Sequence, residues 1–255
     1  NGEGLQHEDG NSHVLSLPVP TCLSYDPTFA YELAVIIEDG IKRMYQDEEQ
    51  VFYYLTVENE NYAQPPMPEG KRVKEGILKG MYQFSQSKSK GPKVQLMGSG
   101  VILREVIAAA ELLEKDWGVS ADIWSVTSFT ELRREGLDVE RWNMLNPDKK
   151  QKQTYVGECL TKAEGPVIAS TDYMKSFADQ IRNFIPQRYV VLGTDGYGRS
   201  DSREALRSFF EVDRYYVVLA ALKALADEGK LPAAKAAEAI KKYKIDAKRP
   251  NPTTV

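Results

Sequence analysis

Residues 93–118, KVQLMGSGVILREVIAAAELLEKDWG, combine the patterns of a strand, a glycine turn and a helix. The first eight residues have the apolar pattern of a strand and end in glycines, which predicts a tight turn into a helix. The helix is expected to bury one stripe of apolar side chains and to stop at a glycine. The residues concerned are Ile102, Val106, Ala109, Leu113 and, at the stop, Gly118. A strand joined to a helix in this way is typical of an α/β protein.

Downstream of this stretch, three more apolar segments predict strands. They begin at Ala121, Pro166 and Arg188 and read ADIWSVTS, PVIASTD and RYVVLGTDG. Two late helices are expected at about 213–228 and 232–243. Because strands and helices alternate, we expect a mostly parallel sheet flanked by helices.

Upstream, the pair Asp26-Pro27 is a favourable helix start, because aspartate can cap free amide groups and proline fits the first turn. The helix is expected to bury one stripe: Ala30, Leu33, Ile37, Ile41 and Met44. The segment VFYYLTV, residues 51–57, predicts a buried strand. Residues 58–70, ENENYAQPPMPEG, contain three prolines and few aliphatic side chains, so we expect a domain boundary there.

Composition excludes several classes of function. The chain has 255 residues, a net charge of -4 and an isoelectric point near 5.5, so it offers no general attraction to nucleic acid or to an anionic membrane. The longest apolar run, from Tyr215 to Leu222, is far shorter than a membrane span. Cys22 and Cys159 have neither metal-ligand spacing nor a disulfide framework, which favours a reducing cytoplasm.

The first thirteen residues, NGEGLQHEDGNSH, contain both histidines of the chain. Imidazole titrates near neutral pH, so His7 and His13 are candidates for proton transfer, although a histidine in a polar loop is more often idle. The chain has no initiator methionine, and we therefore expect it to be a piece of a longer protein.

Two other segments are weaker candidates. The turn GSG at 98–100 could hold a phosphate, but the dinucleotide fingerprint fails because Leu103 stands where the third glycine belongs. A simple tight connection is the better interpretation. The loop GTDGYGRSDSRE, residues 193–204, follows a predicted strand and could be functional. On the residues alone we favour a surface or interface loop in which Asp201 or Ser202 caps the next helix.

The segment GLQHEDGNSH closely resembles the active-site loop of homodimeric bacterial pyruvate dehydrogenases, and EDGNSH is also similar to the EDG-x-x-H loop of transketolases. Further matches to the pyruvate enzymes run along the whole chain, among them VENENYAQPPMPEG, VQLMGSGVILREV, ASTDYMKSFADQI and LGTDGYGRSDSRE. The resemblance implies a transketolase-like α/β fold. Residues 1–66 would be the end of the pyrimidine-binding middle domain, and residues 67–255 would be the carboxy-terminal domain.

The resemblance also implies roles for individual residues. His7 matches the histidine that faces the cofactor and the substrate and assists proton movement, so it is the first choice both as a catalytic and as a cofactor-binding residue. His13 matches the EDG-x-x-H histidine, and Glu3 is expected to help organise the pocket. Asn11 departs from the family, where histidine is frequent, so no role is carried over to it.

By resemblance, the complete enzyme is a homodimer that uses thiamine diphosphate and Mg²⁺. It decarboxylates pyruvate and passes the acetyl unit to lipoamide on the dihydrolipoyl acetyltransferase core. The family's metal and diphosphate motif is not found in this sequence, so no metal ligand is assigned and the chain is expected to be an incomplete fragment.

Two alternatives stay open. The first is a transketolase-type ketol transferase, and the second is a non-catalytic dimerisation or docking fragment. In either a pyruvate dehydrogenase or such a fragment, the helix around Tyr215 to Leu225 is the expected dimer surface.

Overall fold

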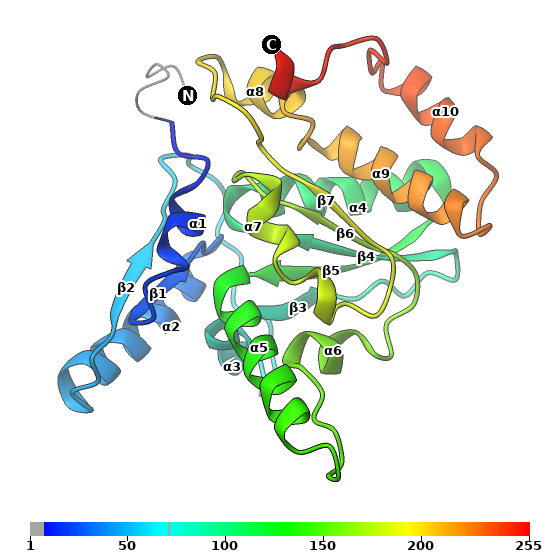
Figure 1. Cartoon of the computed structure of the whole chain (residues 1–255). Helices are drawn as coiled ribbons and strands as arrows, with labels where there is room; N and C mark the ends of the chain where they lie inside the picture. The colour runs from blue at the N-terminus through cyan, green and yellow to red at the C-terminus, as the bar shows by residue number, and fades with distance from the viewer. Residues whose placement is uncertain (1–7, 71) are drawn as a thin grey trace.

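The computed structural model describes residues 8–70 and 72–255 (Figure 1). Its larger part is a five-stranded sheet in the order β3-β5-β4-β6-β7. All neighbouring strands are parallel except β3, which runs antiparallel to β5. The prediction of a mostly parallel sheet is therefore confirmed. The strands are β3 (Met81–Ser85), β4 (Lys93–Gly98), β5 (Ser120–Val126), β6 (Val167–Ser170) and β7 (Tyr189–Leu192).

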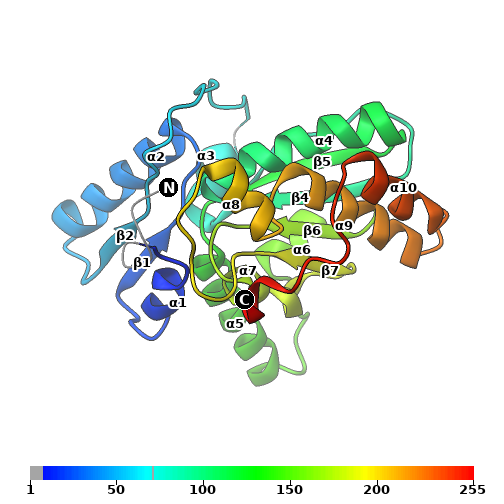
Figure 2. The same ribbon diagram turned by 90° about the horizontal axis from the view of Figure 1, so that it is seen from above.

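Helices cover both faces of this sheet (Figures 1 and 2). Successive strand residues point to opposite faces, so Leu96 of β4 enters one apolar cluster and Met97 the other. The first face packs against α4 (Leu103–Trp117), α9 (Arg214–Asp227) and α10 (Ala234–Lys242). The second packs against α5 (Phe129–Leu145), α6 (Tyr155–Leu160) and α7 (Lys175–Asp179). Helix α8 (Arg203–Phe209) and three short 3-10 helices, Gly100–Ile102, Arg182–Phe184 and Pro252–Thr254, complete this part.

Helix α4 forms as its sequence predicts. Its expected stripe is fully buried, and Gly118 ends the helix at φ 63° with its N–H on the Glu114 carbonyl. The expected exposure of the apolar side chains of α9 is not found. Most of them lie in the chain's own core against α4 and α10, and Tyr215 is the large apolar side chain of this helix that stays exposed, at 39%. Small alanine side chains let α9 approach its neighbours closely, so the stripe that looked free in sequence is already covered.

A smaller sheet precedes the large one. Strands β1 (Cys22–Tyr25) and β2 (Phe52–Leu55) are parallel, and they are connected through α2 (Ala30–Ile41) and a π-helix, Lys42–Gln46. Helix α1 (Ser12–Ser16) comes before them and α3 (Val73–Lys79) after them. The predicted strand at 51–57 is present, but the expectation that it is buried is wrong, because Phe52 is 50% exposed.

The predicted buried stripe of α2 is also wrong. Val35, Ile36 and Glu32 face inward, whereas Ile37 and Ile41 are exposed. The helix begins at Ala30 and not at the Asp26-Pro27 pair. Glu32 fixes the rotation of the helix, because its carboxylate accepts the Phe29 N–H at 3.0 Å as well as the hydroxyls of Tyr82 at 2.7 Å and Ser125 at 2.6 Å. Those hydroxyls lie on β3 and β5, so the buried carboxylate joins α2 to the large sheet.

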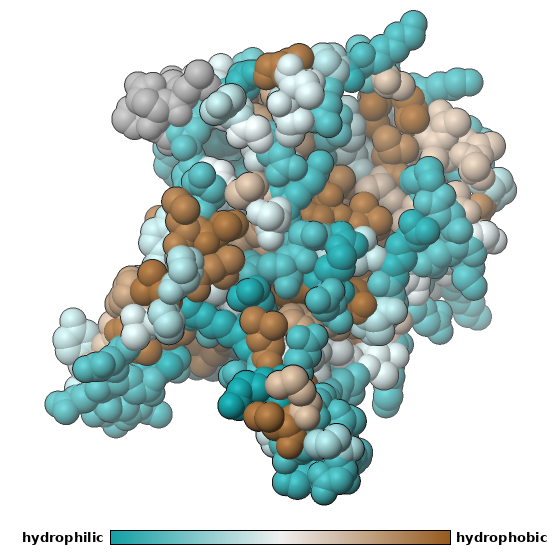
Figure 3. All heavy atoms as spheres, viewed as in Figure 1, coloured by the Kyte–Doolittle hydropathy of each residue, from teal (hydrophilic) through white to brown (hydrophobic). Residues whose placement is uncertain are grey.

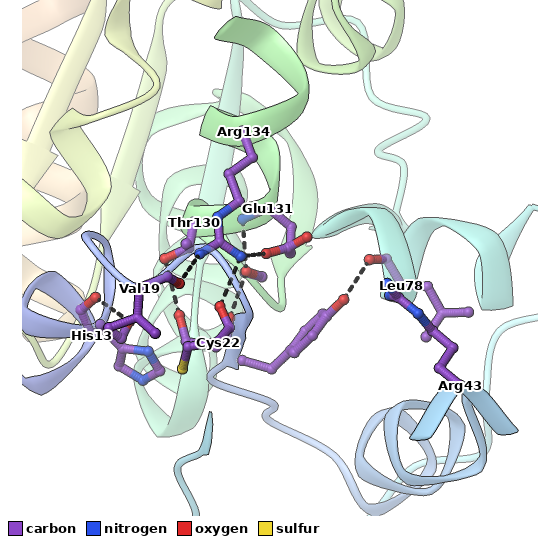
Figure 4. A network of polar contacts seen from close by, with 12 residues as sticks. His13, Val19, Cys22, Arg43, Leu78, Thr130, Glu131 and Arg134 are labelled. Carbon is purple, nitrogen blue, oxygen red and sulfur yellow. Dashed lines mark hydrogen bonds and ion pairs between the residues drawn. The ribbon is translucent and has the colours of Figure 1, made fainter. Parts of the chain in front are cut away.

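A second connection between the two sheets comes from Arg134 on α5 (Figure 4). Its guanidinium donates to the carbonyl oxygens of Cys22 at 2.7 Å and Val19 at 2.9 Å, and to the Glu131 carboxylate at 2.9 Å. The backbone that leads into β1 is thereby held against α5.

Apolar side chains remain at the surface of the arm that contains α1, β1 and β2, and near the tip of α5 (Figure 3). In the described residues, 8–70 and 72–255, no helix combines the length and the apolar character needed to span a bilayer.

Candidate functional site

A cavity of about 870 Å³ opens where the two sheets meet. Its wall is built from the segments that follow β2, β6 and β7, so it lies beyond the carboxyl ends of parallel strands, where ligands bind in α/β proteins. The wall is completed by the loop before α1 and by α8. The lining residues include Glu8, Asp9, Thr56, Glu58, Asp172, Tyr173, Arg199, Arg203 and Arg207.

The acidic loop before α1 is held by hydrogen bonds at two adjacent residues, Asp9 and Gly10. The Asp9 carboxylate accepts the N–H groups of Asn11 at 3.1 Å and Ser12 at 2.9 Å, which holds the first turn of α1. The carbonyl of Gly10 accepts the Met174 N–H at 2.9 Å, which ties the loop to the segment after β6. The loop therefore forms a fixed wall of the cavity.

Glu8 and the loop 193–204 meet across this cavity. Glu8 Oε2 is buried, and a Cβ atom on Gly198 would lie 1.2 Å from it. Burial raises the pKa of Glu8, and the charge of Arg199 opposes that shift. The expectation that Ser202 caps α8 is confirmed, since its hydroxyl accepts the Ala205 N–H at 3.3 Å. The same loop also lines the cavity, which the sequence interpretation did not favour.

The cavity wall contains both carboxylates and guanidinium groups. Burial raises the pKa of both Glu58 and Asp172, and Arg207 opposes this increase in each case. Arg207 in turn is held by Glu60, which also pairs with Arg104, and lies 3.6 Å from Glu105. Burial works against ionisation of Glu60, but Arg207 and Arg104 hold its pKa below the ordinary value. The segment between the two sheets is thus fastened to α4 and α8 by ion pairs.

His13 lies in α1 and is fully buried. Its ring stacks on Phe177 at 4.7 Å between centroids and meets the edges of Tyr173 and Tyr54 at 4.6 and 5.3 Å. Nε2 is 3.0 Å from the Thr56 hydroxyl. Burial lowers the pKa of His13 to about 4, although Asp9 acts in the opposite direction, so the ring is neutral at physiological pH. It can hold or pass a proton through a hydrogen bond, but it does not act as a cation.

The structure places the other predicted residues as follows. His7 and Glu3 lie outside the described residues. Asn11 lines the cavity beside the acidic loop. Cys22 and Cys159 are free thiols on separate elements. In the part of the chain that the structure describes, residues of the types His, Cys, Asp and Glu form no group of three that could hold a metal ion.

The glycine turn at 98–100 holds a carboxylate from the chain itself. A Cβ atom on Gly100, whose φ is 50°, would lie 2.6 Å from Asp26 Oδ2, and the Gly100 N–H donates to the Asp26 carbonyl at 3.0 Å. The Asp26 side chain therefore occupies the space beside this turn. No local pattern in the sequence predicted this pairing, because the two residues are far apart along the chain.

Several wall residues were missed by the sequence analysis. Asp172 follows the predicted strand at 166, so its position beyond a strand end could have marked it. Thr56 and Glu58 follow β2 in the same way, whereas Arg207 carries no local signal because its place depends on how α8 folds over the cavity.

Comparison with known proteins places this geometry in context. Residues 80–213 match the family model described as the transketolase-like TK C-terminal domain, and residues 1–65 match the pyruvate dehydrogenase E1 component middle domain. Pyruvate dehydrogenase E1 components are similar to the chain at 63% identity in Cupriavidus necator and 56% in Escherichia coli K12. These alignments cover 100% and 99% of the chain but only 28% of each relative. The resemblance expected from the sequence is confirmed.

Solved transketolases share the fold. A Pichia stipitis transketolase mutant, R525L, is similar with a TM-score of 0.64 at 16% identity, over 89% of this chain and 28% of that one. Transketolase from Leishmania mexicana gives 0.61 at 15% identity, over 91% and 30%. Similarity at this level of identity concerns the fold alone, so the expected transketolase-like architecture is confirmed.

Proposed function

This chain belongs to the transketolase-like family of C-terminal domains, and from that membership we propose that it supplies part of the active centre of a pyruvate dehydrogenase E1 component. The complete enzyme would decarboxylate pyruvate with thiamine diphosphate and reductively acetylate the lipoyl group of the dihydrolipoyl acetyltransferase core. The names of the relatives and the match of residues 1–65 to the E1 middle domain support this proposal.

The observation that carries the proposal is the meeting of two loops at one cavity. The acidic loop, Glu8 to Asn11, packs against the glycine-rich loop around Gly198, and the space they enclose lies beyond the strand ends. We assign the acidic loop to the middle domain, residues 1–66, and the glycine-rich loop to the carboxy-terminal domain, residues 67–255. The separation of β1 and β2 from the five-stranded sheet supports this division.

Roles for the histidines follow from this arrangement. His7 directly precedes Glu8 in the sequence, and we propose that it faces the substrate, binds the cofactor side of the pocket and moves a proton during turnover. Glu3 would help to organise the same loop. For His13 we propose a supporting role, because its ring is buried and neutral and reaches the cavity wall through Thr56.

Thiamine diphosphate, held through its diphosphate by Mg²⁺, would supply the carbanion that attacks the pyruvate carbonyl. The candidate glycine turn at 98–100 does not fit the diphosphate, because the Asp26 side chain already fills the space beside it. We therefore propose that the diphosphate and Mg²⁺ site lies in the part of the relatives that this chain does not match. The chain alone should then bind thiamine diphosphate too weakly for detection by calorimetry.

Partners and location follow from the same proposal. The complete enzyme would be a cytoplasmic homodimer that takes pyruvate and a lipoyl group and docks on the acetyltransferase core. A transketolase-type activity is not favoured, since its support is limited to the shared fold at 15–16% identity. A non-catalytic dimerisation or docking role would leave the cavity without a substrate.

The test uses the full-length protein that contains this chain. His7→Ala should lower thiamine-dependent release of carbon dioxide from pyruvate by roughly 10²-fold, as expected when acid-base assistance is lost. The control is Lys230→Ala, an exposed residue that does not line the cavity, which should retain full activity. Near-normal turnover of His7→Ala would remove the assignment of that residue. Activity towards ketose phosphates in place of pyruvate would overturn the proposed function.

A further inference from the structure

Three side chains from separate segments form a continuous hydrogen-bonded row between α1 and the end of β1. His13 Nε2 lies 3.0 Å from Thr56 Oγ1, and the same hydroxyl lies 2.7 Å from Asp26 Oδ1. The three residues come from α1, from the position after β2 and from the position after β1. Thr56 also lines the large cavity, whereas His13 and Asp26 are not part of its wall.

Both ends of the row are buried and incomplete. His13 is 0% exposed and Asp26 is 2% exposed. Within residues 8–70 and 72–255, His13 Nδ1 has no hydrogen-bond partner and Asp26 Oδ2 has none with good geometry, although the Ser99 hydroxyl lies near enough to Asp26 to favour its ionised form. Buried polar atoms are almost always paired, so two unpaired atoms at opposite ends of one row call for an explanation.

The two short contacts of the Thr56 hydroxyl define two proton arrangements. A threonine hydroxyl has one proton, so Thr56 can donate to Asp26 at 2.7 Å or to His13 at 3.0 Å, but not to both; the Tyr25 carbonyl, at 3.4 Å, is a longer and weaker acceptor. When Asp26 is ionised, Thr56 donates to it, and His13 must then donate from Nε2 and leave Nδ1 bare. When Asp26 carries its proton on Oδ1, it donates to Thr56, Thr56 donates to Nε2, and the proton of the neutral ring lies on Nδ1. The hydroxyl thus couples the two ends.

We propose that Thr56 and Asp26 are positioning residues for His13 and that the three form a proton relay in which the ionisation of Asp26 sets the tautomer of His13. On ionisation, the Asp26 proton passes to Thr56, the Thr56 proton passes to Nε2, and the proton on the buried Nδ1 is released to a water molecule that reaches the ring when the surrounding side chains open transiently. One proton is lost in total, and the ring stays neutral before and after the step.

The charges around the row set the pH at which it switches. Burial raises the pKa of Asp26 to about 7, and the carboxylates of Glu58 and Asp172 add to this, while the hydroxyls of Thr56 and Ser99 oppose it. Ser99 also pairs with Thr171 at 3.0 Å. Around the histidine, Asp9 is the nearby charge.

The remaining polar neighbours are phenols. Burial raises the pKa of Tyr173, so this neighbour stays neutral throughout the range in which Asp26 titrates, and the Tyr54 hydroxyl is engaged with Ser12 at 2.8 Å. Asp26 is therefore the group in the row that changes charge near neutral pH.

The row of hydrogen bonds follows from geometry and its switching pH from the burial of Asp26, whereas its use in turnover rests on the proposed function. A neutral histidine with a defined tautomer presents either a donor or an acceptor at Nδ1, so the relay would determine which of these His13 offers to its surroundings. A test that observes the imidazole ring of His13 separates the existence of the relay from its role in turnover, since the test needs neither pyruvate nor cofactor.

The chain contains only two histidines, which makes ¹⁵N spectroscopy of imidazole direct. The experiment labels the 255-residue chain with ¹⁵N-histidine, assigns the two rings with a His7→Gln variant, and follows the His13 nitrogens between about pH 5.5 and 8.5, either side of the Asp26 pKa. A protonated and a bare ring nitrogen differ strongly in ¹⁵N shift. We expect Nδ1 to change from protonated to bare, and Nε2 from bare to protonated, around pH 7.

Matched variants test the coupling. Asp26→Asn should make the tautomer independent of pH over this range. Thr56→Val, which keeps the shape and removes the hydroxyl, should also abolish the switch, and Thr56→Ser should restore it. A tautomer that stays constant in the unmodified chain, or a switch that survives in Thr56→Val, would overturn the relay. Circular dichroism melts of each variant confirm that the chain is folded, and if one aspartate or valine variant fails to fold, the other and the unmodified chain still decide the outcome.

Discussion

Gly198 lies so close to Glu8 that a methyl group on the glycine would overlap the carboxylate, with 1.2 Å between its Cβ atom and Glu8 Oε2. The two residues belong to the two loops that enclose the cavity, and they are 190 positions apart in the sequence. A residue without a side chain at position 198 is therefore what allows the acidic loop to close against the loop after β7.

Replacement of Gly198 by alanine should displace Glu8 without unfolding the chain, because the atoms that the new Cβ would overlap belong to the flexible side chain of Glu8. We expect turnover in the full-length protein to fall about tenfold, equivalent to about 1.4 kcal/mol of transition-state stabilisation. The matched control is Gly10→Ala in the same cavity wall, where the nearest atom to the new Cβ is an ordinary 3.7 Å away. Equal activity of both variants would show that the position of Glu8 is unimportant.

The buried His13 and Asp26 should give opposite pH dependences of stability. Burial lowers the pKa of His13 from 6.5 to about 4, so the unfolded chain binds more protons and its contribution is lost as pH falls between these values. Burial raises the pKa of Asp26 from 3.8 to about 7, so its contribution is lost as pH rises through that window. Each contribution amounts to at most roughly 3–4 kcal/mol.

Urea unfolding of single variants separates these two contributions. In Asp26→Asn, the free energy of unfolding should rise from pH 4.5 to 6.5 and then level off, because the effect of His13 remains. In His13→Gln the free energy of unfolding should fall over the range from about pH 4 to 7, because the effect of Asp26 remains. Parallel pH profiles in the two variants would contradict the assigned shifts.

Arg134 should contribute to stability through backbone carbonyls as much as through charge. Arg134→Ala leaves the buried Cys22 carbonyl without its guanidinium donor, so we expect a loss of about 2 kcal/mol in the free energy of unfolding. Arg134→Lys keeps the charge but not the planar fork and should recover only part of this loss. The measurement is chemical unfolding of the three chains, and full recovery by lysine would mean that charge alone matters.

Residues 67–255 contain the whole five-stranded sheet with the helices on both faces, so we predict that this segment folds alone with a cooperative melt. It should nevertheless be less stable than the full chain, because Tyr82 and Ser125 lose the Glu32 carboxylate. Circular dichroism melts of the segment and the full chain test both statements. A melt without a cooperative transition would refute the domain boundary.

The sequence predictions that were confirmed depend on local patterns, whereas those that were wrong depend on contacts between distant residues. The α4 stripe and its Gly118 stop were predictable because a long amphipathic helix beside a buried strand has one way to bury its face. The stripe of α2 was predicted wrongly because apolar side chains occur around much of that helix. A buried polar residue, Glu32, selects the inward face, and its partners lie about 50 and 93 positions away.

Local sequence patterns were sufficient to predict the alternation of strands and helices, the glycine turn after β4, the polar loop before α1 and the family to which the motifs point. These properties depend on near neighbours in the chain, through periodicity, capping and turn chemistry. Three contacts depend on the folded chain: Asp26 fills the space beside Gly100, Thr56 connects it to His13, and Glu8 reaches Gly198. Each of them joins segments that are distant in the sequence and meet only in the folded structure, so no local pattern in the sequence encodes them.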